Sequence, residues 1–478
     1  MSGRGLIASV IGGMIALASS VTAAPPSITL ERAVDPETGT EIRFGALRVY
    51  ENRDAAAGRK IDLAVVVLPA TGPDPRPDPL FVLAGGPGLG AAANYRGHLQ
   101  SPFRRDRDIV LVSQRGTRGS ANLECVVPGD DDDLQSYLDP LFDPDVFRAC
   151  LETLETKADL RMYSTPIAMD DLDDVRAALG YEQINLWGGS YGTRAALVYL
   201  RRHGAHARTA ILNGVAPIAF TNPLFHARSA QRAVELVFEE CAADPECHDV
   251  FPMLPQEFEA VLARLADRDA LVTVTHPATG VREQVALSRK AFESGLRFIM
   301  YLNSREVPLL IHQAFLGDHA PFAQRAIERA RSLRGAVSFG MLLCVTCAED
   351  VDRIDPAAIA RATDGTYIGP ERVLRQKELC SFWPRSILPA NYGEPVRSTV
   401  PVLLLSGTLD PVTPPRWGEE AARHLPNARH LVVPGAHGVG GPCLTRISLA
   451  FLEQGSVDDL DTSCVEDVTL GRFRLPPR

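Results

Sequence analysis

The chain has 478 residues, of which 45% are hydrophobic and 23% are charged, and its formal net charge is −10 at pH 7. This acidic balance, with no basic cluster and no run of stacking aromatic residues, excludes nucleic acid as an expected partner. The length exceeds what one compact core usually accommodates, so we expect more than one structural unit.

The amino terminus shows the three parts of a secretory signal. A start that contains Arg4 is followed by an apolar stretch from Leu6 to Ala18, and the small residues Val21 to Ala23 offer a cleavage site. We expect residues 1–23 to be removed, leaving a secreted or periplasmic protein with no membrane contact. The apolar stretch is too short for a transmembrane helix, and no other segment is long enough. An uncleaved amphipathic amino terminus is the alternative.

A glycine-rich loop is the first candidate site feature in chain order. Pro79–Leu83 is an apolar run typical of a buried strand, and it leads directly into Ala84–Gly88, which reads Ala-Gly-Gly-Pro-Gly. Backbone N–H groups of such a loop can approach a carbonyl oxygen that becomes negative in a tetrahedral intermediate. Pro87 has no N–H, so we expect Gly86 to be the donor. A plain glycine turn is the alternative.

The most informative stretch is Gly188–Gly192, which reads Gly-Gly-Ser-Tyr-Gly. It lies between a strand-like run, Ile184–Trp187, and a helix-like run, Thr193–Leu200. A G-x-S-x-G between a strand and a helix is typical of a nucleophile elbow, a turn so tight that it needs glycine on both sides. We therefore predict Ser190 as a nucleophile and the N–H of Tyr191 as a second oxyanion donor.

The hydrophobic pattern divides the chain into a core and an insertion. From about Ala216 to Tyr392 the periodicity becomes mostly helical, and the strand pattern returns at Val400. A sheet interrupted in this way predicts a core at 24–215 and 393–478, with a helical cap at 216–392 that roofs the site. The predicted core strands are Glu41–Val49, Lys60–Leu68, Pro79–Leu83, Ile109–Ser113, Ile184–Trp187 and Thr209–Asn213, and the predicted cap helices include Ala233–Cys241, Pro255–Leu265, Arg289–Leu302 and Ala323–Leu333.

Two more candidate residues follow strands near the carboxyl terminus. Asp410 comes after the buried strand-like run Val400–Ser406, and His437 comes after a helix at Arg416–Leu425 and a second strand-like run, His430–Val433. The chain order serine, aspartate, histidine, each at the carboxyl end of a strand, is that of an α/β-hydrolase triad. The sequence thus predicts an α/β-hydrolase fold, a mostly parallel sheet flanked by helices with an inserted, mainly helical cap.

The chemistry of acyl transfer requires all three residues. The hydroxyl of Ser190 is a weak nucleophile that needs a base, here His437, while Asp410 would fix the imidazole tautomer and stabilise the imidazolium. The alternatives are a solvated turn residue for Asp410 and a loop histidine for His437. His424 and His430 compete for the role of base, but they fall within a predicted helix and at a strand start.

Nine cysteines in an exported chain predict disulfides. Plausible local pairs are Cys125 with Cys150, Cys241 with Cys247, and Cys443 with Cys464. Cys344 and Cys347 form a C-x-x-C that could instead be a redox or zinc pair, but neither a second C-x-x-C nor a suitably spaced histidine pair supports zinc. We expect no bound metal and no cofactor.

Taken together, the motifs resemble the tripeptidyl aminopeptidase and prolyl aminopeptidase group of α/β-hydrolases. The resemblance spans nearly the whole mature chain, including a carboxyl-terminal segment typical of the secreted tripeptidyl branch. It implies a serine peptidase of small peptide substrates, and it suggests that Cys347 joins Cys380 and leaves Cys344 as the odd thiol. Besides the cysteine placement, it rests on the Gly-Gly-Pro-Gly loop, Gln114–Thr117, Tyr163–Thr165, Asp171–Gly180 and Gly188–Gly192.

One turn departs from the pattern of that group. The turn usually reads Asp-x-Arg-Gly-x-Gly-x-Ser, and here Ser113–Ser120 reads Ser-Gln-Arg-Gly-Thr-Arg-Gly-Ser. Ser113 cannot offer Arg115 a carboxylate, so we expect a local salt bridge to be absent. On that ground, Ser113→Asp is predicted to raise thermal stability and to leave turnover nearly unchanged.

Three functions fit these features. The first is an aminopeptidase that removes residues from free amino termini, in which Glu239 or Glu240 could hold the α-ammonium group. Adjacent helical residues point in different directions, so at most one would face the pocket, and a solvent-facing acidic pair is the alternative. The second is an esterase or amidase with the same triad, because a fold does not fix the substrate. The third, a catalytically silent binding protein, is disfavoured by the intact triad.

Overall fold

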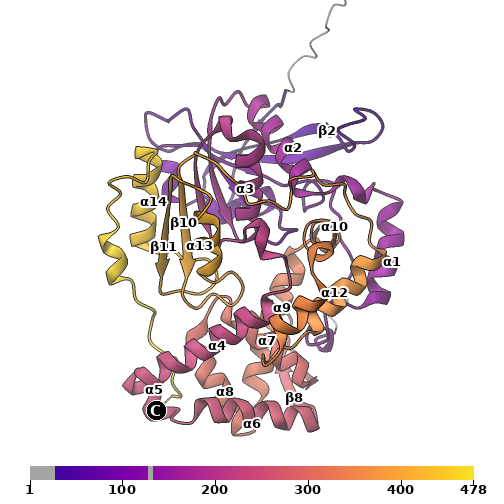
Figure 1. The fold of residues 1–478 in the computed structure, drawn as a ribbon, viewed down its shortest axis with the longest axis vertical. Helices are drawn as coiled ribbons and strands as arrows, with labels where there is room; N and C mark the ends of the chain where they lie inside the picture. The colour runs from indigo at the N-terminus through magenta and orange to yellow at the C-terminus, as the bar shows by residue number, and fades with distance from the viewer. Residues whose placement is uncertain (1–26, 128–132, 478) are drawn as a thin grey trace, which may run out of the picture.

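The computed structural model of the chain describes residues 27–127 and 133–477, so the predicted signal segment 1–23 lies outside the described residues. A nine-stranded sheet runs through the upper part of the molecule (Figure 1). Its strands are β1 (Glu31–Val34), β2 (Glu41–Tyr50), β3 (Lys60–Leu68), β4 (Leu80–Leu83), β5 (Ile109–Val112), β6 (Ile184–Gly189), β7 (Ala207–Asn213), β10 (Val402–Gly407) and β11 (Ala428–Val433).

The strand order is β1-β2-β3-β5-β4-β6-β7-β10-β11. The pairs β1–β2, β2–β3 and β3–β5 are antiparallel, and each neighbouring pair from β5 to β11 is parallel. This confirms the predicted mostly parallel sheet, and the predicted strands lie within two residues of the observed ones. Strand β1 was not predicted, because its residues are largely exposed and form no apolar run.

Helices cover the sheet and fill the insertion between β7 and β10. No helix among them, in the described part of the chain, is both long and apolar enough to span a bilayer. The core helices are α1 (Pro144–Glu155), α2 (Thr165–Ala178), α3 (Tyr191–His203), α13 (Arg416–Ala422) and α14 (Pro442–Gln454). The inserted helices are α4 (His226–Ala243), α5 (Pro245–Val250), α6 (Leu254–Asp267), α7 (Arg289–Met300), α8 (Val307–Phe315), α9 (Ala320–Ala336), α10 (Phe339–Glu349), α11 (Pro356–Thr363) and α12 (Glu371–Phe382).

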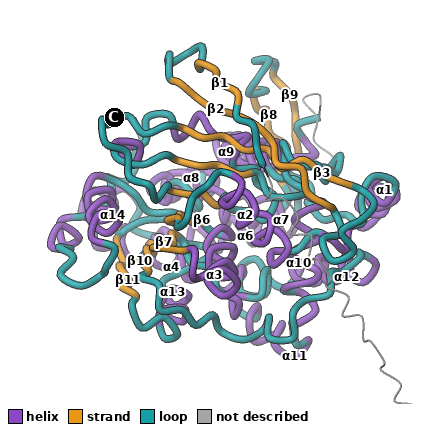
Figure 2. The backbone as a smooth tube through the Cα atoms, turned by 90° about the horizontal axis from the view of Figure 1, so that it is seen from above, coloured by secondary structure: helices purple, strands orange, loops and turns teal. Residues whose placement is uncertain are grey.

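The central strands are buried on both faces, which is why they are continuous apolar runs in the sequence. In β4, Phe81 and Leu83 pack in one hydrophobic cluster with residues of α3, whereas Leu80 and Val82 pack in another with residues of α14. Alternate strand residues point to opposite faces of a sheet. Accordingly, α3 and α14 lie on opposite sides of β7 and β10 (Figure 2).

The insertion packs in two groups. Helices α4 to α9 contribute to a hydrophobic cluster of their own, which includes Val234, Phe258 and Phe322. Helices α10 and α12 instead join the main core cluster through Phe339 and Leu379, and in Figure 1 they lie beside α1. The insertion also contains an antiparallel hairpin, β8 (Ala270–Thr275) with β9 (Arg282–Leu287), which the helical periodicity did not predict.

Four disulfides tie loops and helices together, and they confirm the predicted pairing. They link Cys125 with Cys150, Cys241 with Cys247, Cys347 with Cys380, and Cys443 with Cys464. Cys347–Cys380 joins α10 to α12. Since Cys347 is bonded to Cys380, it does not pair with Cys344. The alternative interpretation of the C-x-x-C as a redox or zinc pair is therefore wrong.

Candidate active site

Ser190 lies in a strained turn between β6 and α3. Its backbone has φ +54° and ψ −123°, a conformation that non-glycine residues rarely adopt. The flanking glycines are required by close backbone contacts: a Cβ on Gly188 would lie 2.4 Å from the carbonyl oxygen of Gly192, and a Cβ on Gly192 would lie 2.1 Å from that of Leu83. The turn therefore has the geometry of a nucleophile elbow.

Hydrogen bonds hold this turn to the neighbouring strand. The N–H of Ser190 donates to the carbonyl of Asn213 at 2.9 Å, at the end of β7. The Thr193 hydroxyl donates to the carbonyl of Ser190 at 2.6 Å and accepts from the N–H of Ala216 at 2.8 Å. Ser190 is thus fixed next to the segment that follows β7, which also contains Gly214.

Asp410 is fully buried in the loop that follows β10. Its Oδ1 accepts hydrogen bonds from the N–H groups of Val412 and Thr413, both at 2.8 Å, and its Oδ2 accepts one from the Thr413 hydroxyl at 2.8 Å. Burial alone would raise the pKa of Asp410, but the charge and hydrogen bond of His437 and these backbone donors lower it. Asp410 is therefore ionised.

His437 meets Asp410 from the loop after β11. Its Nδ1 lies 2.9 Å from Asp410 Oδ2, and because a carboxylate only accepts, this nitrogen carries the proton and leaves Nε2 as the base. The ring also lies against Gly214, where a Cβ would be 3.4 Å from Cε1. Ser190 and His437 therefore both border the turn at Gly214.

The other two histidines considered from sequence lie elsewhere. His430 Nε2 is 2.9 Å from the hydroxyl of Ser406, and His424 Nε2 lies 3.7 Å from Glu420. The partners found for these two histidines do not include Asp410, whereas His437 Nδ1 lies 2.9 Å from Asp410 Oδ2. The base assignment to His437 thus agrees with the geometry of the site.

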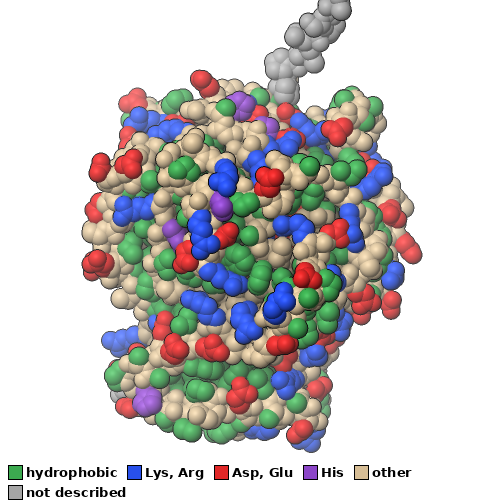
Figure 3. All heavy atoms as spheres, viewed as in Figure 1, with side chains coloured by type: hydrophobic (Ala, Val, Ile, Leu, Met, Phe, Trp, Pro, Cys, Tyr) green, Lys and Arg blue, Asp and Glu red, His purple; other side chains and the backbone are tan. Residues whose placement is uncertain are grey.

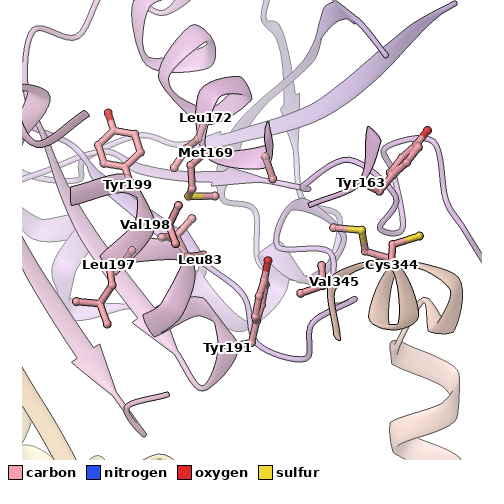
Figure 4. Close-up of a cluster of buried hydrophobic side chains, with 14 of the residues drawn as sticks. Leu83, Tyr163, Met169, Leu172, Tyr191, Leu197, Val198, Tyr199, Cys344 and Val345 are labelled. Atoms are coloured by element: carbon pink, nitrogen blue, oxygen red, sulfur yellow. The ribbon is translucent and has the colours of Figure 1, made fainter. Parts of the chain in front are cut away.

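The glycine-rich loop after β4 comes close to Ser190. A Cβ on Gly85 would lie 3.3 Å from Cβ of Ser190, and Gly86 has φ +114°. Tyr191 begins α3, so its N–H is one of the unpaired donors at the helix start. Its side chain extends into the core (Figure 4), where its hydroxyl lies 2.8 Å from Thr165 Oγ1 and 3.3 Å from Gln114 Oε1.

A cavity of about 240 Å³ opens in front of Ser190, between the core and the inserted helices. Gly86, Ser190 and Tyr191 lie on its core side, and side chains of α7, α9 and α12 line the opposite side. Its walls are mostly apolar. Glu239 and Glu240 do not line it, and Glu240 instead pairs with Arg305 at 2.7 Å. The structure thus contradicts their assignment as ligands of a substrate ammonium group in this cavity.

The reaction centre also contains residues that were not predicted from the sequence. Tyr301, from the insertion, packs its ring edge-on against His437 with centroids 5.0 Å apart, and its carbonyl accepts from the N–H of His437 at 3.2 Å. His226 lines the cavity, fully buried, and burial together with the charges of Arg297, Arg372 and His437 lowers its pKa well below the usual value. A strand-end motif signals neither residue, because His226 begins the inserted helix α4 and Tyr301 directly follows the inserted helix α7.

The expected loss of a salt bridge at Arg115 is wrong. Arg115 is fully buried and makes a bidentate pair with Asp171 of α2, with Nε–Oδ2 2.6 Å and Nη2–Oδ1 2.9 Å. Its Nη1 also donates to the carbonyls of Glu51 and Met162. The carboxylate comes from a distant segment, which inspection of the local turn could not show. The stabilising effect predicted for Ser113→Asp loses its basis.

Cys344 is an inert core residue. It is fully buried on α10, where Figure 4 shows it near Tyr163. Burial raises the pKa of its thiol to about 12, and the indole N–H of Trp383 lies 3.4 Å from its sulfur. A thiol of this kind is neither nucleophile nor metal ligand at neutral pH.

One group in the described chain has the composition of a metal site. Asp173, His203 and His206 bring one ligand atom each within 4.8 Å of the others. Asp173 Oδ1, however, already accepts from Arg176 at 2.7 Å and from Tyr199 at 2.8 Å, and His206 Nδ1 lies 2.8 Å from the same oxygen. These contacts form an ion-pair network that leaves little acceptor capacity for a metal ion.

Comparison with known proteins agrees with this geometry. Residues 78–248 match the α/β hydrolase fold family, and residues 366–464 match the TAP-like protein family. The serine protease Hip1 of Mycobacterium tuberculosis is 24% identical over 500 residues, which cover 95% of this chain and 94% of that protein. Hip1 of Mycobacterium bovis matches equally.

Solved structures also match. A proline iminopeptidase of Mycobacterium smegmatis has 16% identity and a TM-score of 0.43, covering 86% of this chain and 98% of its own. An esterase of Exiguobacterium antarcticum has 14% identity and a TM-score of 0.39, covering 83% and 96%. The chain thus has an α/β-hydrolase fold, and the sequence matches are consistent with the tripeptidyl and prolyl aminopeptidase group that its motifs resemble.

Proposed function

We propose that this chain is an exported serine peptidase that releases short peptides or single residues from free amino termini through an acyl-enzyme at Ser190. The observation that carries the proposal is the placement of Ser190 and His437 against the same turn, with His437 Nδ1 2.9 Å from Asp410. Its similarity to the serine protease Hip1 over 95% of the chain supports a peptidase. Four disulfides fit an oxidising compartment outside the cytoplasm.

The proposed reaction follows from these positions. Ser190 Oγ attacks the substrate carbonyl while His437 Nε2 takes its proton, and Asp410 stabilises the imidazolium that forms. The N–H groups of Gly86 and Tyr191 bind the oxyanion. His437 then gives the proton to the leaving amine, and water hydrolyses the acyl-enzyme by the same steps.

The size of the cavity favours short substrates. A volume of about 240 Å³ lies just below the range of roughly 300–1,000 Å³ for ordinary small-molecule sites and holds a few residues rather than a long chain. Inserted helices also line this cavity, and we infer that they limit how far a substrate can extend beyond the reacting carbonyl. An esterase of small acyl groups uses the same residues and is the second candidate, favoured by the mostly apolar walls.

The test measures release of p-nitroaniline from Ala-Ala-Pro-p-nitroanilide with a free or an acetylated amino terminus. We expect hydrolysis of the free form, a clear preference over the acetylated form, and loss of both in Ser190→Ala. Equal rates on the two forms would refute the aminopeptidase. Hydrolysis of p-nitrophenyl butyrate without any release from the anilides would favour the esterase.

A further inference from the structure

Two arginines line the cavity without a carboxylate partner. Arg297 comes from α7 and Arg372 from α12, and both face the space in front of Ser190. Within the described chain, the hydrogen bond found for Arg297 is from Nη1 to the Tyr301 hydroxyl at 3.1 Å, and Arg372 Nε is buried with no hydrogen-bond partner. Neither guanidinium lies within 4.0 Å of a described Asp or Glu oxygen.

Aromatic rings hold the two guanidinium groups in place. Arg372 stacks on Phe142, with Cζ 3.6 Å from the ring centroid, and Arg297 lies 4.7 Å from the centroid of Phe298. Such contacts fix the plane of a guanidinium but satisfy none of its N–H donors. Both arginines therefore keep donors free for a ligand.

The acidic residues of the cavity are already paired or exposed. Asp350 binds Arg194 through both oxygens at 2.7 Å, and Glu293 pairs with Arg289 at 2.6 Å. Glu371 pairs with Lys290 and Arg375, and Asp139 is solvent-exposed. The uncompensated charge inside the cavity is thus positive, although the chain as a whole has a net charge of −10. Figure 3 shows acidic and basic side chains mixed over one outer face of the molecule.

This arrangement is unfavourable without an anion. Burial and the neighbouring charge of Arg297 lower the pKa of Arg372 to about 9, which still leaves it protonated at neutral pH. Two adjacent buried cations repel each other, and a bound carboxylate would relieve the repulsion and fill the free donors.

We propose that Arg297 and Arg372 form a carboxylate-binding subsite that selects anionic substrates. Arg297 contacts Tyr301, which packs against His437, so a carboxylate held there lies in the same cavity as Ser190. The substrate class is a short peptide with a negative charge close to the cleaved bond. A free carboxyl terminus and an acidic side chain offer the same chemistry. The inference rests on the proposed peptidase function for its substrate class.

Binding to the Ser190→Ala variant tests the subsite without turnover. Isothermal titration calorimetry compares tri-alanine, tri-alanine carboxamide and the acidic carboxamide Ala-Glu-Ala-NH₂. We expect at least one of the carboxylate-bearing peptides to bind about tenfold or more tightly than tri-alanine carboxamide, because charge-assisted hydrogen bonds are replaced by neutral contacts in the latter. Tighter binding of tri-alanine assigns the site to the carboxyl terminus, and tighter binding of Ala-Glu-Ala-NH₂ assigns it to the side chain.

Substitutions test whether the two arginines cause the preference for carboxylate-bearing peptides. Arg372→Gln and Arg297→Gln, made in Ser190→Ala, should each abolish most of it, and Arg372→Lys should keep part of it because it retains the charge but not the planar fork. Arg375→Gln is the matched control, since Arg375 also lines the cavity but is paired with Glu371 at 2.8 Å. Circular dichroism verifies the fold of every variant.

Two results overturn the inference. One is equal affinity for all three peptides, and the other is a preference that survives both arginine substitutions in folded protein. These outcomes are distinct from failure of the proposed function, which is read from hydrolysis by the unmodified enzyme. A chain that cleaves peptides without a charge preference keeps the function and loses the subsite. A chain that binds carboxylates tightly but does not hydrolyse peptides keeps the subsite and loses the proposed function.

Discussion

Replacing Asp410 with asparagine should reverse the proton arrangement on His437. In the structure Oδ1 of Asp410 accepts from two backbone N–H groups at 2.8 Å, and Oδ2 faces His437 Nδ1 at 2.9 Å. The two backbone donors will orient the asparagine so that its oxygen occupies the Oδ1 position. The amide NH₂ then faces His437, which has to accept at Nδ1 and carry its proton on Nε2.

A histidine protonated at Nε2 cannot take the proton of Ser190. In another serine-protease fold, the equivalent change of aspartate to asparagine lowers kcat by roughly 10⁴-fold through the wrong tautomer. Since Asp410 is held here by four donors and is fully buried, we expect a loss of similar size, roughly 10³- to 10⁴-fold in kcat, or about 4–5.5 kcal/mol in the activation barrier.

The assay is kcat on the free-amino-terminus anilide, with the melting temperature measured in parallel. We expect KM to change little, because Asp410 does not line the cavity. Thr413→Val is a milder comparison, since it removes one hydroxyl donor to Asp410 at 2.8 Å but keeps the carboxylate. A folded Asp410→Asn enzyme that retains more than a tenth of the original kcat would refute the assigned role of Asp410.

Three stability predictions follow from the described contacts, each read by urea or thermal unfolding. Ser113→Asp should destabilise the protein by at least about 3 kcal/mol, because the new carboxylate would be buried without a partner. Ser113 is fully buried, its hydroxyl has no hydrogen-bond partner among the described residues, and Arg115 is already paired. A higher melting temperature of the variant contradicts this prediction. Gly192→Ala should destabilise the protein by about 3 kcal/mol or more, because the new Cβ would clash with backbone atoms that cannot move aside. Gly204→Ala is the control, at the end of the same helix with open space around it, and it should be neutral or stabilising. Similar losses of stability in both variants would argue against the backbone clash. Burial alone would raise the pKa of Asp173, but hydrogen bonds from Arg176, Tyr199 and His206 lower it to about 2, below the unfolded value of 3.8. Asp173 therefore contributes roughly 2 kcal/mol to the stability of the folded protein above about pH 4, and this contribution is lost as the pH falls toward 2. Asp173→Asn should remove that part of the acid dependence, and an unchanged slope of stability between pH 5 and 2 would show that the network contributes nothing.

Much of the core could be predicted because its signals are local. Buried parallel strands such as β4 and β10 are short apolar runs, and the elbow is a five-residue pattern whose glycines are required by contacts within a few residues or with the adjacent strand. The order of Ser190, Asp410 and His437 along the chain predicted that they would meet, since each follows a strand of one parallel sheet. The structure places Asp410 and His437 in contact and Ser190 beside the same turn as His437.

The insertion was predicted less well. Its helices were expected from periodicity, but β8 and β9 were not, because these two short strands lie within a segment whose pattern is otherwise helical. Nor could the sequence divide the insertion into the group around Phe258 and the group that packs on the core through Phe339. That division depends on which element the apolar face of each helix packs against. An amphipathic pattern identifies the apolar face of a helix but not the element that will cover it.

The sequence by itself predicted the central strands, the elbow, the chain order of the reacting residues and three local disulfide pairs, and the family resemblance suggested the fourth, Cys347 with Cys380. Only the tertiary structure decided that Asp171 pairs with Arg115, that Tyr301 packs against His437, and that two arginines of the cavity have no carboxylate partner among the described residues. The physical reason is the range of the interaction. Strand and turn preferences act over a few residues, whereas charge compensation in a buried site depends on groups that are far apart in the chain and meet only after folding.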